Sequence, residues 1–261
     1  MLITSKENPS VKEYIKLRDK SKYRRETGLF VLEGARIATD AVNENIGIRY
    51  AFITEDARMR YPEAAELLSA RLGENLFDIS GDISARISDT GGAQGIFLVA
   101  ERLDKPISLN TINNGSKFVI LNNLQDPGNV GTILRCADAC GIDGVFLCGG
   151  CDLYNPKLIR STMGSLFRLP VSTEYEYYQL LEKLASKGVL TYASVIDKDA
   201  SSLRDFKFDG SCAVVIGNEG NGLSHEEAAA CDGRITIKMN GNIDSLNAAT
   251  AASIIMWELT K

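Results

Sequence analysis

The sequence predicts an α/β protein of two consecutive units, and three observations support this. Short apolar runs typical of buried strands alternate with segments that carry apolar residues at helical spacing. A polar stretch with Pro106 and the run Asn113-Asn114-Gly115 is typical of a linker. The chain of 261 residues is long enough for two domains, and 44% hydrophobic with 24% charged residues is usual for a soluble globular protein. We therefore predict an α/β domain at 1–105, a linker at 106–116 and a second domain at 117–261.

The first unit is expected to open with a helix. Asn8 and Pro9 supply an N-cap and a first-turn proline, so the helix runs from about Ser10, and Gly28 ends the basic pattern that follows. The rest of the unit alternates between strands and helices. We predict strands at 29–32, 50–53, 76–79 and 96–100, and helices at 35–45, 62–72 and 82–88.

Charge is distributed unevenly along the chain. Residues 1–25 hold eight basic and three acidic residues, which gives this segment a charge of +5. Because the net charge of the chain is −5, the remaining residues together carry −10. A basic segment on an acidic protein fits contact with a polyanion at one end of the protein. A solvated first helix explains the same charges equally well.

The second unit opens with a βαβ pattern around an unusually polar loop. The apolar run at 118–121 predicts a strand, a helix pattern follows up to Gly141, and 145–148 predicts the next strand. Between strand and helix, positions 122–129 are polar or turn-forming except for Leu124. Open α/β sheets bind ligands at the carboxyl ends of strands, so this loop predicts a ligand site. Arg135, one and a half turns into the helix, lies within reach of it.

The remaining elements continue the alternation. We predict a helix start near Pro156, helices at 177–187 and 248–259, and strands at 189–195, 212–216 and 235–239. Strands that alternate with helices predict a mostly parallel sheet.

Two further strand ends lead into loops of the kind that bind ligands. After the strand at 212–216 comes Gly217-Asn218-Glu219-Gly220-Asn221-Gly222, whose three glycines allow a backbone to approach a ligand closely. Ser224 and Glu227 then form a capping box for the next helix. The loop is not G-x-G-x-x-G and has no Walker lysine, so a dinucleotide site is disfavoured. After the strand at 235–239, Ser245 or Asn247 caps the last helix, whose free N–H groups favour an anion.

Cysteine spacing gives no support for a metal site. All six cysteines lie in the second half of the chain, and buried free thiols in a reducing compartment are expected. Cys148 and Cys151 have zinc or redox spacing, but no second pair exists and the single histidine, His225, is distant. No apolar run is long enough to span a membrane and the N-terminal residues do not form a secretory signal, so a cytoplasmic location is expected.

Taken together, the three loops resemble the motifs of the SpoU (TrmH-like) family of RNA ribose 2′-O-methyltransferases, within the SPOUT superfamily. The first motif is similar to 129–135, the second to 217–222, and the third to 237–239 with 245–247. The stretch 160–170 is similar to the family's sequence between its first two motifs. The N-terminal unit resembles, less specifically, the small substrate-binding domain that many members carry. Lys238 is a departure, because the family usually has proline there.

This resemblance implies a C-terminal SPOUT domain with a parallel sheet and a deep trefoil knot, a homodimer, and S-adenosylmethionine as cofactor. It implies that the cofactor is bound by Gly217, Asn218, Gly220, Ile237, Met239 and Leu246. It also implies a catalytic pocket formed by Arg135, Asn129, Glu219, Ser245 and Asn247. Arg135 acts there either as general base or as a clamp on the 3′-phosphate that steadies the developing alkoxide. Glu219 either orients neighbouring side chains or forms a local salt bridge.

The predicted function is S-adenosylmethionine-dependent 2′-O-methylation of a ribose in structured RNA. Ribosomal RNA is favoured over transfer RNA, because the N-terminal unit and its basic helix suit a large structured substrate. A transfer RNA methyltransferase, an RNA-binding member without catalysis and a nucleotide-dependent oxidoreductase are the alternatives. The sequence identifies neither the RNA nor the methylated nucleotide.

Overall fold

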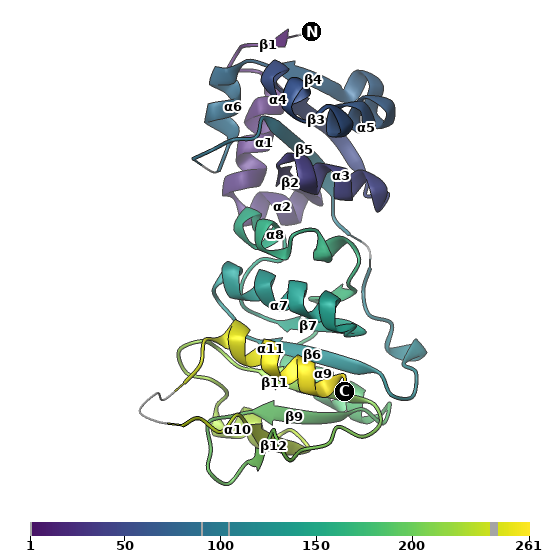
Figure 1. The fold of residues 1–261 in the computed structure, drawn as a ribbon, viewed down its shortest axis with the longest axis vertical. Helices are drawn as coiled ribbons and strands as arrows, with labels where there is room; N and C mark the ends of the chain where they lie inside the picture. The colour runs from purple at the N-terminus through teal and green to yellow at the C-terminus, as the bar shows by residue number, and fades with distance from the viewer. Residues whose placement is uncertain (1, 90, 104, 241–244) are drawn as a thin grey trace. The chain divides into compact units, whose positions relative to one another are not determined.

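The computed structural model describes residues 2–89, 91–103, 105–240 and 245–261 (Figure 1). Contacts divide the chain into two compact units. The N-terminal unit comprises Met1–Asp104 with Asp152–Phe167, and the C-terminal unit comprises Lys105–Cys151 with Arg168–Lys261. Residues 152–167, which lie inside the second predicted domain, therefore pack with the first unit.

The N-terminal unit is built on a mixed five-stranded sheet. Its strand order is β1 (Leu2–Ile3), β4 (Leu76–Ile79), β3 (Ile48–Ile53), β5 (Ile96–Glu101) and β2 (Leu29–Glu33). Strand β5 runs antiparallel to both of its neighbours, and the other pairs are parallel. The strands and helices predicted for this unit are confirmed, and β4 and α5 have the predicted bounds.

Helices cover both faces of this sheet. On one face of the sheet, α1 contributes Val11, Tyr14 and Leu17, which pack with Ile83 and Ile87 of α6. Burial of these apolar side chains away from water stabilises the packing. The other face carries α3 and α5. The helices are α1 (Pro9–Asp19), α2 (Ser21–Thr27), α3 (Ala35–Asn43), α4 (Glu55–Arg60), α5 (Pro62–Leu72), α6 (Gly81–Ile87) and the short 3₁₀ turn η1 (Gly73–Asn75).

Helix α8 (Pro156–Thr162) and the 3₁₀ turn η3 (Ser165–Phe167) complete the N-terminal unit. Helix α8 packs against β2. Just before it, Asp152 accepts two hydrogen bonds from Arg24, at 2.8 Å from Nε and 2.7 Å from Nη2. Arg24 is only 4% exposed, so this ion pair fixes the segment to the end of α1 and to α2. The Tyr154 ring packs on Phe30 with a centroid separation of 4.8 Å.

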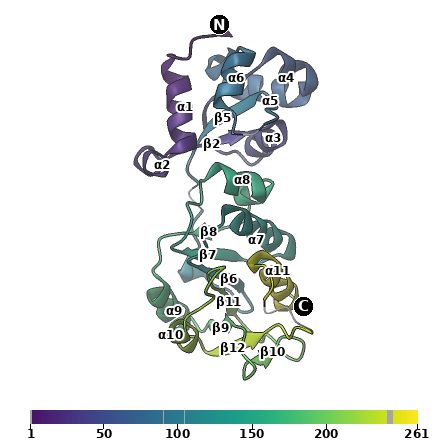
Figure 2. The ribbon, with the colours of Figure 1, turned by 90° about the vertical axis from the view of Figure 1, so that its left-hand side faces the viewer.

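The C-terminal unit contains a seven-stranded sheet whose paired strands are all parallel, which confirms the predicted parallel sheet. Helices α7 and α11 cover one face, and α9 and α10 the other (Figure 2). The strand order is β10 (Ser201–Ser202), β12 (Gly233–Thr236), β9 (Leu190–Ser194), β11 (Cys212–Ile216), β6 (Lys117–Asn122), β7 (Gly144–Cys148) and β8 (Val171–Ser172). The helices are α7 (Pro127–Cys140), α9 (Tyr177–Ala185), α10 (His225–Ala229), α11 (Ala248–Leu259) and the 3₁₀ turn η2 (Leu109–Thr111).

One predicted strand is wrong in its bounds. The strand expected at 235–239 is β12, which spans Gly233–Thr236. Its neighbours β9 and β10 offer pairing partners only for residues 233–236, so the backbone leaves the ladder after Thr236.

The stretch predicted as a linker packs on the C-terminal unit: Ile107 is buried and its amide donates to Ser172 Oγ at 2.8 Å.

Candidate cofactor and catalytic site

A cavity of about 450 Å³ opens at the carboxyl edge of the C-terminal sheet. Its walls come from the segments that follow β9, β11 and β12 and from the start of α11. The structure brings all the residues predicted to hold the cofactor to this cavity, together with two predicted catalytic residues. These are Gly217, Asn218, Gly220, Ile237, Met239 and Leu246, with Glu219 and Ser245.

The loop after β11 packs so tightly that its backbone forms the cavity wall. A Cβ on Gly217 would lie 2.4 Å from the carbonyl carbon of Gly222, so only glycine fits. Gly222 adopts a φ of 65°, in the left-handed region. Asn218 closes the loop, because its Oδ1 accepts from Gly220 N at 2.9 Å and its Nδ2 donates to Asn123 O at 2.9 Å. A ligand can therefore lie directly against main-chain atoms.

The segment after β12 supplies the apolar side of the cavity. Ile237 and Met239 line it, whereas the intervening Lys238 is exposed and does not. The Lys238 charge is therefore not part of the cavity wall. Leu246 and Ala248 continue the apolar wall onto α11.

Three predicted catalytic residues form one hydrogen-bonded network. Asn247 Nδ2 donates to Asn129 Oδ1 at 3.0 Å, and Asn129 Nδ2 donates to Glu219 Oε1 at 3.2 Å. The Glu219 carboxylate also accepts from the backbone amides of Gln125 and Asp126, each at 3.0 Å. The network thus joins the three loops that follow β6, β11 and β12.

These contacts explain the ionisation of Glu219. Burial alone would raise its pKa, but hydrogen bonds from the amides of Gln125 and Asp126, from its own amide and from Asn129 outweigh burial. The pKa of Glu219 is therefore lower than its ordinary value, and the side chain is a carboxylate at neutral pH. It accepts hydrogen bonds and forms no salt bridge with a side chain in the described part of the chain.

Arg135 stands apart from this network. It projects from the third turn of α7, further into the helix than predicted, because α7 begins at Pro127 after the N-cap Asp126. Its side chain is exposed. Among the described residues it makes no hydrogen bond or ion pair, and it does not line the cofactor cavity. Ser245 lines the cavity but is likewise exposed. The structure therefore leaves the guanidinium available to a ligand from outside this chain.

The cavity suits a nucleoside joined to an amino acid. Its volume lies in the range of small-molecule sites, and it combines apolar side chains with main-chain polar groups that fix orientation. Across residues 2–89, 91–103, 105–240 and 245–261, no three His, Cys, Asp or Glu side chains cluster as metal ligands. In the same ranges, no helix has the length and apolar character needed to cross a membrane.

Comparisons with known proteins agree with this geometry. The model of the SpoU rRNA Methylase family matches residues 116–257, more than half of the chain. The chain belongs to this family. The MRM3-like substrate binding domain matches residues 8–98. Family membership confirms the resemblance seen in the three sequence motifs.

Whole-length relatives place both units in the family. An uncharacterized tRNA/rRNA methyltransferase from Synechocystis is 30% identical, with 98% of this chain and 92% of that protein covered. The 23S rRNA (guanosine(2553)-2′-O)-methyltransferase RlmP of Bacillus subtilis is 29% identical, with 98% of each covered. The AdoMet-bound rRNA methyltransferase structure from Sinorhizobium meliloti superimposes with a TM-score of 0.85 at 29% identity, over 99% of this chain and 97% of that one. The α/β SPOUT fold with a smaller N-terminal domain is confirmed.

One wall of the cavity in this SpoU methylase was not predicted from the sequence. Ser194, the last residue of β9, and Val195 and Ile196, which follow it, line the cavity beside the two predicted loops. They lie at the carboxyl end of a parallel strand, and this position is the feature that could have identified them. Their ordinary composition, without glycine or asparagine, gave no further indication.

Proposed function

We propose that this SpoU methylase transfers a methyl group from S-adenosylmethionine to a ribose 2′-hydroxyl of ribosomal RNA. Membership of this family supports the predicted activity, RNA methyl transfer, and the predicted cofactor, S-adenosylmethionine. The observation that carries the proposal is the cavity itself: the two loops with the family's motifs after β11 and β12 meet there at one sheet edge. Hydrogen bonds from Asn129 to Glu219 and from Asn247 to Asn129 join the first motif to these loops. The dinucleotide oxidoreductase alternative has no comparable support, since the glycine loop lacks the required spacing.

The cofactor supplies an activated methyl group, and the residues of this chain hold the cofactor and the adjoining loops in place. Main-chain atoms around Gly217 and Gly220 and the apolar side chains of Ile237, Met239 and Leu246 hold the cofactor at the sheet edge. The Asn247–Asn129–Glu219 network fixes the adjoining loops. Methyl transfer needs the hydroxyl oxygen in line with the methyl group, so rigid positioning contributes a large part of the rate.

We assign the RNA side of the site to Arg135. Its guanidinium is exposed and has no partner in the described part of the chain, which suits a bidentate contact with a ribose phosphate. A guanidinium normally stays protonated, so we favour stabilisation of the developing alkoxide over proton abstraction. Ser245 assists from the cavity rim.

Substitution of Arg135 tests this assignment. Arg135→Ala should lower methyl transfer about 100-fold or more while S-adenosylmethionine affinity and thermal stability stay near wild type. Arg135→Lys should recover part of the activity if charge is what matters. Equal losses of cofactor affinity and of transfer in calorimetry and tritium assays would make Arg135 a structural residue instead.

Ribosomal RNA is the substrate we propose. Relatives that align along the whole chain include an enzyme named for 23S rRNA, and the N-terminal unit carries the basic segment of residues 1–25. Deleting the gene and mapping 2′-O-methyl groups across ribosomal and transfer RNA should reveal one missing ribosomal methyl group. Loss of a transfer RNA methyl group instead would reassign the substrate, and no loss in either would contradict the cellular role. A cytoplasmic location follows from this substrate.

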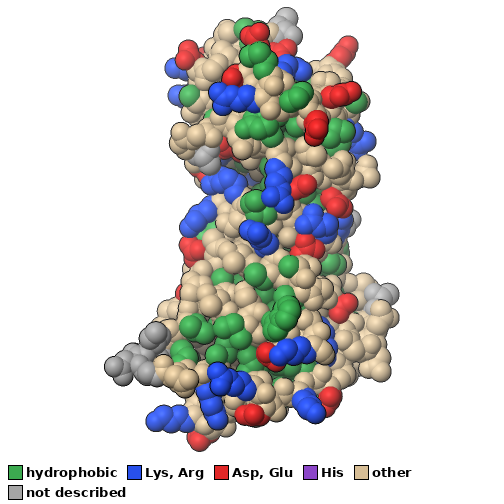
Figure 3. Space-filling view, in the orientation of Figure 1, with side chains coloured by type: hydrophobic (Ala, Val, Ile, Leu, Met, Phe, Trp, Pro, Cys, Tyr) green, Lys and Arg blue, Asp and Glu red, His purple; other side chains and the backbone are tan. Residues whose placement is uncertain are grey.

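We propose a homodimer formed through the face that carries α11. Ile254 and Trp257 of α11 are 39% and 64% exposed, although both are large and apolar. Hydrophobic side chains gather on this face of the C-terminal unit (Figure 3). Exposed apolar patches of this kind mark protein interfaces. Light scattering should show a dimer for wild type and a monomer for Trp257→Glu; a wild-type monomer at micromolar concentration would contradict the proposal.

We also propose that the C-terminal unit carries the trefoil knot. Strands β9 and β11 separate β12 from β6, yet α11, which follows β12, packs against α7 and β11. Ile237, Met239 and Leu246, which follow β12, line the same cavity as the tight loop after β11. This path supports a threaded arrangement, which is rare among folds.

A further inference from the structure

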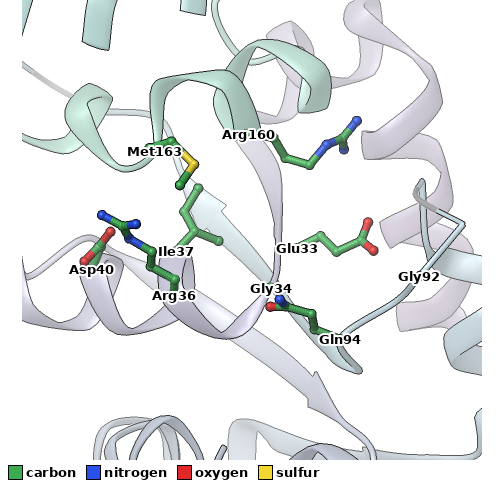
Figure 4. Close-up of a pocket in the computed structure, with 9 residues that line it drawn as sticks. All are labelled: Glu33, Gly34, Arg36, Ile37, Asp40, Gly92, Gln94, Arg160 and Met163. Carbon is green, nitrogen blue, oxygen red and sulfur yellow. The ribbon is translucent and has the colours of Figure 1, made fainter. Parts of the chain in front are cut away.

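The N-terminal unit contains a second cavity, of about 420 Å³. It lies between the start of α3, the end of α8 and the segment that precedes β5 (Figure 4). None of its lining residues belongs to the cofactor cavity or to the network of Asn129, Glu219 and Asn247. The family motifs therefore leave this cavity without a role.

One wall is a methionine in a backbone conformation that methionine rarely adopts. Met163 ends α8 with a φ of 51°, in the left-handed region where glycine is the usual residue. Its side chain is 39% exposed and lies toward Ile37 across the cavity (Figure 4). A strained position that keeps a large apolar side chain points to use of that side chain. A polarizable, flexible thioether adapts well to a flat ring.

The polar groups of the cavity surround this apolar wall. Gln94 Oε1 accepts from Ala35 N at 2.7 Å, which leaves its Nε2 group without an acceptor among the described residues. Arg36 and Arg160 lie on opposite sides of the Met163–Ile37 pair (Figure 4). Arg160 is held by Asp89 at 2.8 Å, whereas Arg36 is exposed and has no hydrogen bond or ion pair within the described ranges.

This combination fits a single unstacked nucleotide. Proteins recognise such nucleotides by placing the base against a side chain, bonding its edge to an amide and contacting its phosphate with arginine. The Glu33 carboxylate accepts from Ser88 Oγ at 2.5 Å and Asp89 N at 3.0 Å, and it points to the side of the cavity away from the Arg36 guanidinium (Figure 4). Asp40 also lines the cavity, and its carboxylate lies against Gly164.

We propose that this cavity binds one unstacked nucleotide of the RNA substrate, with the base against Met163 and Ile37 and the phosphate at Arg36. The inference rests on the proposed RNA methyltransferase function and deepens it, because it gives the N-terminal unit a specific means of selecting RNA with an unpaired nucleotide. The base edge meets Gln94. Arg160 closes the side opposite Arg36.

Two substitutions separate this role from folding. Met163→Gly removes the apolar wall and relieves the backbone strain, so stability should hold or rise while affinity for deproteinised large-subunit ribosomal RNA falls about fivefold. Arg36→Ala should weaken RNA binding to a similar extent and lower the salt slope of log K by about one. Met59→Ala and Arg49→Ala are exposed matched controls outside the cavity and should change neither quantity.

The measurements are filter binding of the full chain to that RNA over a salt series, with S-adenosylmethionine calorimetry and tritium transfer in parallel. RNA affinities of Met163→Gly and Arg36→Ala equal to those of the controls would overturn the inference. Weakening seen with intact ribosomal subunits but not with bare RNA would overturn it too, in favour of a ribosomal protein as partner. If wild type binds RNA through the cavity yet transfers no tritium, the methyltransferase proposal fails and the nucleotide site stands.

Discussion

Asn247 Nδ2 donates to Asn129 Oδ1 at 3.0 Å, which ties the N-cap of α11 to the first turn of α7 across 118 positions of sequence. The Asn247 side chain is used at both ends, because its Oδ1 also accepts from Ala249 N at 2.9 Å and Thr250 N at 3.3 Å. One amide thus starts a helix and orients the site. The two uses can be separated by substitution.

Asn247→Asp keeps the capping oxygen but loses the donor to Asn129, whereas Asn247→Ala loses both. We expect Asn247→Ala to lower the free energy of unfolding by ~1 kcal/mol, because it removes the helix cap. Asn247→Asp should lower it by less, because the capping oxygen remains. Methyl transfer should fall in both variants, because both remove the hydrogen bond that Asn247 Nδ2 donates to Asn129 Oδ1. Urea unfolding and tritium transfer measure the two effects; full activity in Asn247→Asp would mean that the Asn129 contact is dispensable.

Glu219 should make stability depend on pH in the acid range. Its pKa in the folded chain is below the ordinary value of 4.5, so its contribution is present above that pH and is lost as pH falls through the lowered pKa. Glu219→Gln should therefore be less stable than wild type at neutral pH, with a gap that closes between pH 4.5 and lower values. Thermal unfolding from about pH 7 to pH 3 measures the gap, and Glu66→Gln, an exposed helix position, controls for the loss of a carboxylate elsewhere. A gap that is constant with pH would refute this account.

The two ends of the glycine loop should respond differently to a methyl group. Gly217→Ala places a Cβ 2.4 Å from backbone, so the loop must move, with a cost of ~1–3 kcal/mol in stability and loss of S-adenosylmethionine binding. Gly220→Ala is the matched control, because its nearest neighbour, Asn218 Oδ1, would be 3.4 Å away. Calorimetry with the cofactor compares them, and equal affinities would show that the close approach at Gly217 does not shape the site.

The Arg24–Asp152 pair should be worth far more than a surface pair. Asp152→Ala leaves the guanidinium of Arg24 buried without its carboxylate, and we expect a loss of ~3 kcal/mol in the free energy of unfolding. Glu26→Ala breaks the exposed Lys22–Glu26 pair, with both side chains more than half exposed, and should change stability by less than ~0.5 kcal/mol. Similar losses in the two variants, measured by urea unfolding, would contradict the difference in burial.

Much of the fold follows from local sequence. Periodicity and caps predict α5, β4, β11 and α11 at their observed bounds, because each has a complete apolar pattern with a proline, glycine or asparagine at an end. The three ligand loops are also predictable, since parallel strands bring their carboxyl ends to one edge. The predicted segments 129–135, 217–222, 237–239 and 245–247 thus outline the proposed site.

What the sequence could not supply depends on contacts between distant segments. The two-residue strands β1, β8 and β10 exist only through their ladder partners, and β12 ends where β9 and β10 stop pairing. Met163 in the left-handed region cannot be foreseen from a helix pattern, because its surroundings compensate for the strain. The Asn129–Glu219 hydrogen bond likewise requires the folded arrangement of three loops.

The packing of α8 in the N-terminal unit limits how the two halves of this protein can be exchanged. The chain passes between the units near residues 104, 151 and 167, so neither unit is a continuous piece. A fragment starting at residue 117 would carry α8 and η3 without β2 and Arg24, and would expose Leu158, Ile159, Leu166 and Phe167, all buried here. An ancestor that gained or replaced its N-terminal half by simple fusion would have needed matching changes in α8. Recombination between relatives is thus expected to keep α8 and the N-terminal half together as one inherited block.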